Sequence, residues 1–331
     1  MNNHMTGGVG LVLGGAVPPE KLAKLATGAE SAGFDELWIS EDFFVTGGIS
    51  AANTVLSSTN SIRVGLGVVS ALVRHPALLA MEIATTSRAH PGRFTPGVGL
   101  GVPVWMEQMN LLPKSPLSAM RGCVTAVRDL LDGKGIASEG KASSYDPIRL
   151  EFPPTERVPL YMGAVGQKML ELSGEIADGS ILSVGAGSEY VKWARKQVEI
   201  GRQRSGRTGT HRITVFAIYS VGPDAQEASN AARKALAFYK GTGGRNALTD
   251  VAGISDELEG LAARGGIKEV EEAMPDRWID DLTISGTPDE VVAKITRLRE
   301  SGADAIGLFP ADGDRIEEVL NLTASHVLPE L

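Results

Sequence analysis

The sequence has a single cysteine, Cys123, among its 331 residues. One thiol cannot build a disulfide framework or a zinc site made of cysteines, and such scarcity is typical of a reducing compartment. No apolar run approaches the roughly 18 residues that a membrane-spanning helix needs. The first eight residues also lack the apolar stretch of a secretory signal peptide. We therefore expect a cytoplasmic protein with no membrane segment.

Aromatic residues are few, with 8 Phe, 4 Trp and 5 Tyr, and the 32 Lys and Arg are outnumbered by 40 Asp and Glu. An acidic chain with no basic stripe argues against nucleic acid as a partner. Glycine is abundant instead, with 40 residues. Many tight turns around a core of small aliphatic residues are typical of an α/β enzyme with a small-molecule substrate, rather than of a β-sandwich or a disordered chain.

Short apolar runs alternate with segments of helical spacing along the whole chain. The predicted strands are 9–13, 37–39, 62–69, 94–101, 158–162, 180–184, 212–221 and 305–309, and the predicted helices are 18–32, 76–89, 116–131, 167–178, 188–205 and 288–301, before a C-terminal helix. Nearly all-apolar strands joined by helices pair in parallel. Eight such units predict one (β/α)8 TIM barrel over residues 1–331, with an open doubly wound sheet as the alternative.

Three features depart from a regular barrel. Pro96 lies inside the fourth strand and cannot donate to a central ladder, so the regular part of this strand is expected from Gly97. Residues 133–157 are longer than an ordinary connection and are predicted to hold a small hairpin or a lid. Residues 223–282 are charged and predicted to form a helical insertion.

The active site of a barrel lies at the carboxyl ends of its strands, and here these ends are rich in glycine and poor in titratable side chains. Glycine lets the backbone approach a flat or phosphorylated ligand closely, although each glycine could equally serve only its turn. No Ser/His/Asp or Cys/His set stands out, and no residues have metal-ligand spacing. We expect no metal site, and an organic cofactor that carries the chemistry.

The most informative stretch is 162–179, where a strand ends, a glycine loop follows and a helix begins near Gln167. The free N–H groups and the dipole of such a helix start favour an anion, so we predict a phosphate cradle. The stretch has neither the Gly-Lys-Ser/Thr ending of a P-loop nor the three-glycine dinucleotide spacing. Four of its residues recur at helical spacing and are expected in the core rather than at the cofactor: Met169, Leu172, Ser173 and Ile176.

Two adjacent carboxylates, Glu41 and Asp42, follow the second strand. They suit acid–base work or binding of a polar ligand edge at the barrel mouth. Successive residues of a strand point to opposite sides, so only one of them is expected to face the pocket. The alternative is a solvated pair at the rim. His75, at a helix start, is interpreted as a base or a cap, and the turn that begins at His90 as structural.

The stretch from Tyr161 to Gly179 is similar to the coenzyme phosphate loop and helix of methylenetetrahydromethanopterin reductase. Further blocks that match the same family are 34–42, 64–70, 74–80, 92–101 and 285–290. Over nearly its whole length the chain resembles the luciferase-like (β/α)8 oxidoreductases, in particular the branch that uses the deazaflavin coenzyme F420. Relatives that use FMN share the barrel and several of these blocks.

The resemblance implies F420 as the cofactor, with FMN as the alternative, and a homodimer. It places a bulge with a cis peptide at Gly67–Val68, beneath the cofactor ring, and puts Ser70 and Asp42 near the ring or the substrate. The predicted cofactor-binding residues are Gly67, Val68, Ser70, Gly99, Gly101, Gly163, Ala164, Val165, Gly166 and Gln167, and the predicted catalytic residues are Asp42 and Glu41.

Three proton-handling positions differ from those of the family. Asp42 stands where sugar-phosphate and secondary-alcohol enzymes have a histidine. The sugar-phosphate enzyme has a glutamate near the position that Val102 occupies in this sequence. The pterin reductase has a glutamate on its first strand, where this chain has Val12. The resemblance thus predicts the cofactor but leaves the substrate open. The main hypothesis is F420-dependent hydride transfer to or from a small organic substrate. The others are an FMN-dependent monooxygenase fed by a separate reductase and a non-catalytic cofactor-binding or scaffold protein.

Overall fold

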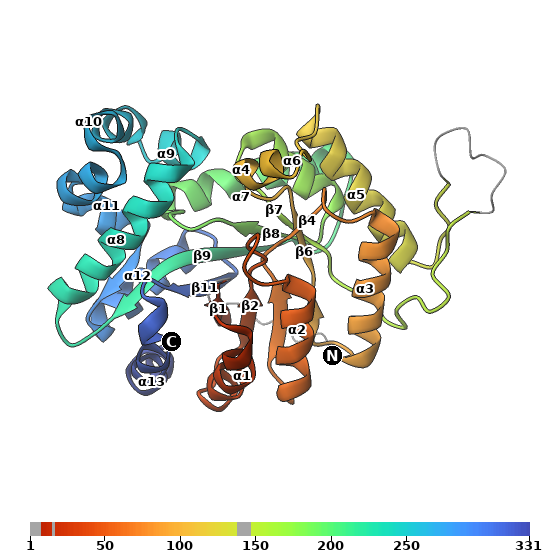
Figure 1. Cartoon of the computed structure of the whole chain (residues 1–331), viewed down its shortest axis with the longest axis horizontal. Coiled ribbons are helices and arrows are strands. Elements are labelled where there is room, and N and C mark those ends of the chain that lie inside the picture. Colours follow the sequence, from red (N-terminus) through yellow and green to blue (C-terminus); the bar gives the residue numbers. More distant parts are fainter. Residues whose placement is uncertain (1–7, 15–16, 138–146) are drawn as a thin grey trace.

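The computed structural model describes residues 8–14, 17–137 and 147–331, and it shows an α/β fold built on a curled parallel sheet (Figure 1). The strands are β1 Gly8–Leu13, β2 Glu36–Ile39, β3 Arg63–Leu66, β4 Val69–Ser70, β5 Phe94–Thr95, β6 Gly97–Gly99, β7 Tyr161–Gly163, β8 Gly179–Leu182, β9 Arg212–Val221, β10 Ile284–Gly286 and β11 Ala305–Pro310. Their order is β4-β6-β7-β8-β9-β11-β1-β2-β3-β5, and β10 pairs with β9.

Two predicted strands are each broken in the middle. The strand expected at 62–69 is β3 followed by β4, and the break contains a cis peptide between Gly67 and Val68, as the family resemblance implies. The strand expected at 94–101 divides at Pro96, whose carbonyl accepts the Tyr161 N–H at 2.9 Å. Because β3 pairs with β5 and β4 pairs with β6, the two breaks lie side by side.

Helices cover the outer face of the sheet (Figure 1). They are α1 Leu22–Ser31, α2 Gly48–Ser58, α3 Pro76–Ala89, α4 Pro103–Gln108, α5 Pro116–Leu131, α6 Gln167–Ile176, α7 Ser188–Ser205, α8 Ala225–Gly243, α9 Ala247–Val251, α10 Ser255–Ala273, α11 Asp276–Leu282, α12 Pro288–Glu300 and α13 Ile316–His326. The predicted bounds of α3, α5 and α7 are confirmed. So is the capping box at the start of α12, where the Glu290 carboxylate accepts the Thr287 N–H at 2.8 Å.

Three elements of the structure were not predicted: α2, α4 and β10. The helix α2 is rich in Gly, Ser, Thr and Asn, which have weak helical propensity. It forms because Ala51, Ala52, Val55 and Leu56 are buried on one of its faces. The fifth strand was also predicted too early. β7 begins at Tyr161, after Pro159, which has no N–H to give to a ladder.

A mainly aromatic group of side chains fills the inside of the curled sheet. This central cluster consists of Val12, Trp38, Tyr161, Ile181 and Phe216. The rings of Trp38 and Phe216 meet edge to face, with 5.5 Å between their centroids. Glycines make room for these rings, since a Cβ at Gly67 would lie 2.4 Å from Phe216. A separate, larger apolar layer lies between the strands and the outer helices.

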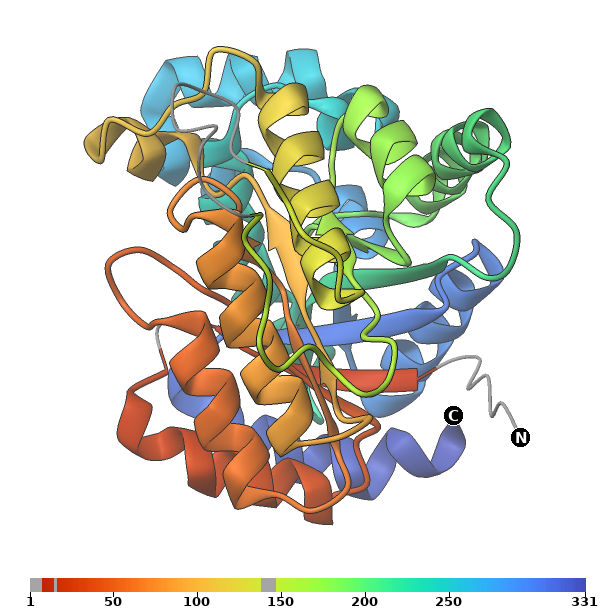
Figure 2. The same ribbon diagram turned by 90° about the vertical axis from the view of Figure 1, so that its right-hand side faces the viewer.

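The long segment 223–282 is helical, as predicted, and consists of α8 to α11. Figures 1 and 2 show these helices gathered on one side of the molecule. They have an apolar core of their own, which includes Leu236, Leu258 and Trp278. Helix α8 also packs on β9 and β10, so this segment is anchored directly to the sheet.

Only part of the predicted hairpin at 133–157 falls within the described residues. Ile136 and Ile148 form an antiparallel bridge with two backbone hydrogen bonds, of 3.0 and 2.9 Å. Residues 138–146, between them, lie outside the described part of the chain. No helix among the described residues is long and apolar enough to cross a membrane. Cys123 is buried on α5, where burial raises the pKa of its thiol to about 11.

Candidate active site

A cavity of about 940 Å³ opens at the carboxyl ends of the strands. We call it the carboxyl-end cavity. Its wall combines residues that follow most of the strands with residues of α4, α5 and α8. All the residues predicted for the site lie in this wall, namely Glu41, Asp42, Gly67, Val68, Ser70, Gly99, Gly101, Gly163, Ala164, Val165, Gly166 and Gln167. The fold therefore brings together positions from four separate segments of the sequence.

The floor of the cavity is formed around Val68. A Cβ at Gly99 would lie 2.4 Å from Val68 Cγ2, and a Cβ at Gly163 would lie 3.0 Å from Val68 Cγ1. No side chain can therefore project from either glycine without displacing Val68. Beneath it, the floor rests on the central cluster, against which Val68 packs.

Ser70 and Gly101 shape the neighbouring wall. The Ser70 hydroxyl donates to the Leu100 carbonyl at 2.9 Å and accepts the Leu72 N–H at 3.1 Å, which fixes the chain after β6. Gly101 has φ +88°, a left-handed conformation that favours glycine. A Cβ there would also lie 2.9 Å from the Met106 side chain. Both residues hold the backbone in place at the cavity.

The predicted phosphate loop joins β7 to α6. Gly166 is the N-cap of α6 and leaves this helix end without a side-chain cap. The loop is fixed from both sides, since Tyr190 of α7 donates to the Val165 carbonyl at 2.6 Å and the Ala164 N–H donates to the Ile181 carbonyl at 3.2 Å. The first N–H groups of a helix have no acceptor within it, and here they belong to a wall of the cavity. This arrangement suits a phosphate.

Two findings refine the prediction for α6. Leu172 and Ser173 are buried, as expected, and Ser173 hydrogen-bonds to Ser180 at 2.8 Å. Met169 and Ile176 are only partly buried against the core. Met169 also lines the carboxyl-end cavity, so its assignment to the core alone was wrong. Lys168 lies in the same wall and adds a positive charge that the sequence analysis did not single out.

Glu41 is held in a network of hydrogen bonds. Arg74 donates to both of its carboxylate oxygens, at 2.7 and 2.6 Å, and the Gly48 N–H donates to Oε2 at 3.0 Å. The Glu41 side chain is 2 % exposed and that of Arg74 is 22 % exposed, so the carboxylate is removed from water while the guanidinium keeps partial access to it. The hydrogen bonds that Arg74 donates to Glu41 also raise the pKa of Arg74 above its ordinary value. Glu41 thus joins the chain after β2 to the start of α2 and to the segment before α3.

Asp42 is half-buried and lies in the same cavity wall as Tyr239, which comes from a distant part of the chain. Burial, and secondly the charge of Asp42, raises the pKa of Tyr239 to about 12. Tyr239 comes from α8, and its ring meets Phe309 edge to face at 5.8 Å. No local motif marks Tyr239 in the sequence, because only the packing of α8 on the sheet brings it to the site.

The rest of the wall is largely apolar. It contains Phe43, Trp105, Phe216 and Phe309, none of which was predicted for the site. The rings of Phe43 and Trp105 meet edge to face at 6.0 Å, and a second cis peptide joins Phe43 to Phe44.

The structure also places Val102, Val12 and His75, which were considered in the sequence. Val102 lies in the cavity wall, whereas Val12 is buried in the central cluster. His75 caps α3, accepting the Ala77 N–H at 3.2 Å, which confirms that interpretation over a base. No group of three or more His, Cys, Asp or Glu that could hold a metal ion occurs among the described residues.

A curled parallel sheet, an apolar cavity at the carboxyl ends of its strands and a helix start in the cavity wall define a cofactor-binding α/β protein. Comparison with known families gives a more specific assignment. A family model described as luciferase-like monooxygenase matches residues 4–305, and the chain belongs to this family.

Similar proteins are matched over almost their full length. The chain is 29 % identical over 312 residues to 5,10-methylenetetrahydromethanopterin reductase of Archaeoglobus fulgidus, covering 92 % of this chain and 93 % of the relative. It is 30 % identical over 334 residues to F420-dependent glucose-6-phosphate dehydrogenase of Nakamurella multipartita, covering 95 % and 93 %. The structure of coenzyme F420-dependent tetrahydromethanopterin reductase from Methanopyrus kandleri matches with a TM-score of 0.84 at 23 % identity, covering 98 % of this chain and 99 % of that one.

The recognition of the luciferase-like family, with relatives that are F420-dependent oxidoreductases, is therefore confirmed. An FMN-bound Baeyer–Villiger monooxygenase component has the same fold, with a TM-score of 0.73 at 18 % identity and 98 % coverage of both chains.

Proposed function

We propose that this protein is an oxidoreductase that uses coenzyme F420 and transfers a hydride between the deazaflavin and a small organic substrate. The observation that carries the proposal is the carboxyl-end cavity. Val68, which Gly99 and Gly163 flank, forms the floor of this cavity. The start of α6 at Gly166, which has no side-chain cap, belongs to the wall of the same cavity. Two relatives that match over almost their full length support the proposal. One is named a 5,10-methylenetetrahydromethanopterin reductase and the other an F420-dependent glucose-6-phosphate dehydrogenase.

The residues fit a flat cofactor with a phosphate. Val68 offers an apolar surface that no side chain from Gly99 or Gly163 interrupts. The backbone N–H groups of Gly166 and Gln167 would bind the phosphate, and the nearby Lys168 ammonium adds to the attraction. Phe43, Trp105 and Phe309 would exclude water from the remaining space. When bound, F420 supplies hydride chemistry, because its ring carries carbon where a flavin has its reactive nitrogen.

Two side chains of this chain would handle the substrate. Tyr239, whose pKa is about 12, remains protonated at neutral pH and would donate a hydrogen bond to a substrate oxygen. Asp42, in the same wall, would accept or return a proton. Glu41 was the second candidate for this role, but both of its oxygens already accept hydrogen bonds from Arg74. The proposed proton-transfer group is therefore Asp42 alone.

The FMN-dependent monooxygenase is the alternative, and a pair of binding titrations separates the two. The purified protein is stripped of cofactor and titrated with F420 and, separately, with FMN. The proposal requires tight binding of F420 and much weaker binding of FMN, followed by turnover of reducible substrates with the reduced deazaflavin. Tight binding of FMN and weak binding of F420, with oxygen consumption, would overturn it. Binding of neither would favour a scaffold protein.

We also propose that residues 1–331 form one domain in which eight strand units close into a (β/α)8 barrel. Support comes from the broken strands, since β3 pairs with β5 at one end of the sheet path and β4 pairs with β6 at the other. In addition, we propose a cytoplasmic homodimer, as the family resemblance implies. Sedimentation equilibrium that yields a mass near 34.8 kDa would contradict the dimer.

A further inference from the structure

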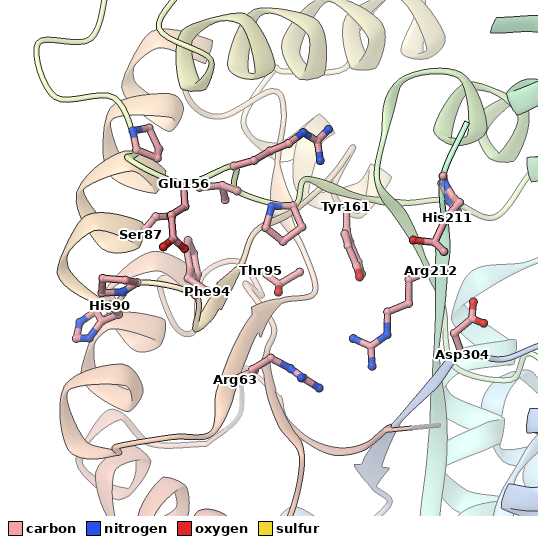
Figure 3. A pocket seen from close by; sticks show the side chains of 18 of the residues that line it. Arg63, Ser87, His90, Phe94, Thr95, Glu156, Tyr161, His211, Arg212 and Asp304 are labelled. Carbon is pink, nitrogen blue, oxygen red and sulfur yellow. The ribbon is translucent and has the colours of Figure 1, made fainter. Parts of the chain in front are cut away.

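A second cavity, of about 530 Å³, lies at the opposite end of the sheet (Figure 3). We call it the amino-end cavity, because Arg63, Phe94, Tyr161 and Arg212 in its wall are the first residues of their strands. The ends of barrel strands on this side ordinarily serve stability rather than chemistry. Nothing in the proposed oxidoreductase reaction uses this cavity.

At the floor of the amino-end cavity, the guanidinium groups of Arg63 and Arg212 share the carboxylate of Glu36. Oε1 of Glu36 accepts hydrogen bonds from Arg63, at 2.9 Å, and from Arg212. The other oxygen, Oε2, accepts the Trp38 indole N–H at 3.1 Å. Glu36 is 4 % exposed, whereas the side chains of Arg63 and Arg212 are 31 % and 21 % exposed. The two cations thus reach the cavity, while the anion that neutralises one of them lies beneath.

Arg63 and Arg212 give the wall of this cavity its excess of positive charge. Five arginines and three acidic residues line the cavity, although the chain as a whole has a net charge of −8. Arg157, one of the five, shares the Asp178 carboxylate with Arg128 and Arg207, at 2.7, 2.6 and 2.9 Å. Arg195, by contrast, pairs with Asp304.

Arg212 has hydrogen-bonding capacity left over. Its Nε and Nη2 atoms are buried without a hydrogen-bond partner among the described residues, as is the Ser87 hydroxyl in the same wall. Burial opposes the charge on Arg212, but Glu36 and Tyr161 hold its pKa above the ordinary value. Figure 3 shows the side chains of Arg63 and Arg212 extending toward each other, with the Tyr161 ring above them. Arg63 and Arg212 share the single Glu36 carboxylate, so this group of three side chains carries a net positive charge, and a bound oxyanion would offset it.

We propose that the amino-end cavity binds a small multivalent oxyanion, of the phosphate or polycarboxylate type, between Arg63 and Arg212. Arginine suits this ligand because its planar fork pairs with two oxygens at once. The Tyr161 hydroxyl, and the Thr95 hydroxyl beside it in the wall, supply neutral donors. A bound oxyanion would bridge β3 and β9, which lie apart in the order of the sheet.

Isothermal titration of the intact protein with pyrophosphate, at constant ionic strength, tests the proposal. We expect a saturable binding event at this cavity that Arg63→Gln weakens at least tenfold. Thr95→Glu places a carboxylate in the cavity and should also abolish binding, without removing a partner of Glu36. Titrations with inorganic phosphate and with citrate distinguish phosphate from polycarboxylate ligands. Circular dichroism confirms that each variant is folded.

Two matched variants separate this site from other sources of binding. Arg204→Gln removes the same charge from the outer face of α7, where Arg204 pairs with Glu171 and Glu175, and should leave binding unchanged. Lys168→Gln changes the carboxyl-end cavity and should also leave it unchanged. Absence of saturable binding, or its loss in Lys168→Gln with retention in Arg63→Gln, would overturn the proposal.

Discussion

Arg74 divides the two adjacent carboxylates of the site into different roles. Its terminal nitrogens lie 2.7 and 2.6 Å from the two oxygens of Glu41, whereas the charge of the neighbouring Asp42 raises the pKa of Tyr239 of α8. The alternation of side chains along an extended chain predicts that two consecutive acids point to different surroundings. The structure shows what these are: a buried ion pair for one acid and the carboxyl-end cavity for the other.

Glu41→Gln should lower the free energy of unfolding by about 3 kcal/mol, because it leaves the charge of Arg74 without its buried partner. Denaturant unfolding measures the change. Glu82→Gln is the matched control, since Glu82 is the more exposed partner of Arg74, at 3.4 Å, and its loss should cost less than about 1 kcal/mol. Equal effects of the two substitutions would contradict the assignment of Glu41 as the structural partner.

Asp42→Asn should lower kcat roughly 100-fold or more while changing the affinity for F420 less than about threefold. The amide keeps the shape of the carboxylate but cannot take up a proton at neutral pH. Single-turnover kinetics across a range of pH, together with a cofactor titration, measure both quantities. Tyr239→Phe is the companion variant, and it should raise KM through the loss of one hydrogen bond. An unchanged kcat in Asp42→Asn would remove Asp42 from the mechanism.

Gly99→Ala should weaken cofactor binding at least tenfold. The new methyl group would lie 2.4 Å from Val68 Cγ2 and would force Val68 up into the cavity. Removing the obstruction supplies a control: the double variant Gly99→Ala, Val68→Ala should recover part of the affinity. Titration of both variants with F420 decides the point, and equal affinity of wild type and Gly99→Ala would show that this floor does not support the cofactor.

The stability of the fold should depend on His211 in mildly acidic solution. Burial, followed by the charges of Arg202 and Arg207, lowers the pKa of His211 from 6.5 to about 4. Between these values the unfolded chain takes up a proton that the folded chain does not, so stability falls as the pH falls. The difference amounts to about 3 kcal/mol once the pH reaches 4.

Unfolding free energies of wild type and His211→Gln, measured between pH 7 and pH 4, test this dependence. The variant should lose less stability on acidification than the wild type does. His326→Gln, at the exposed end of α13, should follow the wild-type curve. Parallel curves for wild type and His211→Gln would contradict the prediction.

Lys240→Met should stabilise the protein at pH 7. Lys240 is 3 % exposed, its side chain packs against Gly185, and burial lowers its pKa from 10.5 to about 8. Below pH 8 the folded chain bears the whole cost of burying the charge, which is about 3 kcal/mol. The wild type should therefore gain stability between pH 8 and pH 10.5, and the variant should not. Lys268→Met, on an exposed part of α10, is the control.

Much of this fold could be predicted because its signals are local. Apolar runs located the strands, and helical spacing located α3 and α5. The carboxyl ends of those strands then predicted the location of the site, and every predicted residue lines one cavity there. The prediction of a cis peptide at Gly67–Val68, which the family resemblance implies, also depended on a local motif.

The remaining features depend on contacts between distant parts of the chain. Tyr239 reaches the site only because α8 packs on β9 and β10. The arrangement at Glu36 requires Arg63 and Arg212, which are 149 residues apart, to meet at the amino ends of their strands. The helix α2 was missed because burial of its apolar face, rather than the propensity of its residues, stabilises it. No window of sequence contains such information.

The floor at Val68 has a consequence for how this site can diversify. Its shape is specified by backbone and by the absence of side chains at Gly99 and Gly163, whereas the groups that would meet a substrate, Asp42 and Tyr239, stand on a loop and on an outlying helix. Substitutions in that loop and helix leave the floor intact. Selection can therefore exchange the substrate while the apparatus for the cofactor is inherited unchanged, and the same separation tells an engineer which half of the cavity to randomise.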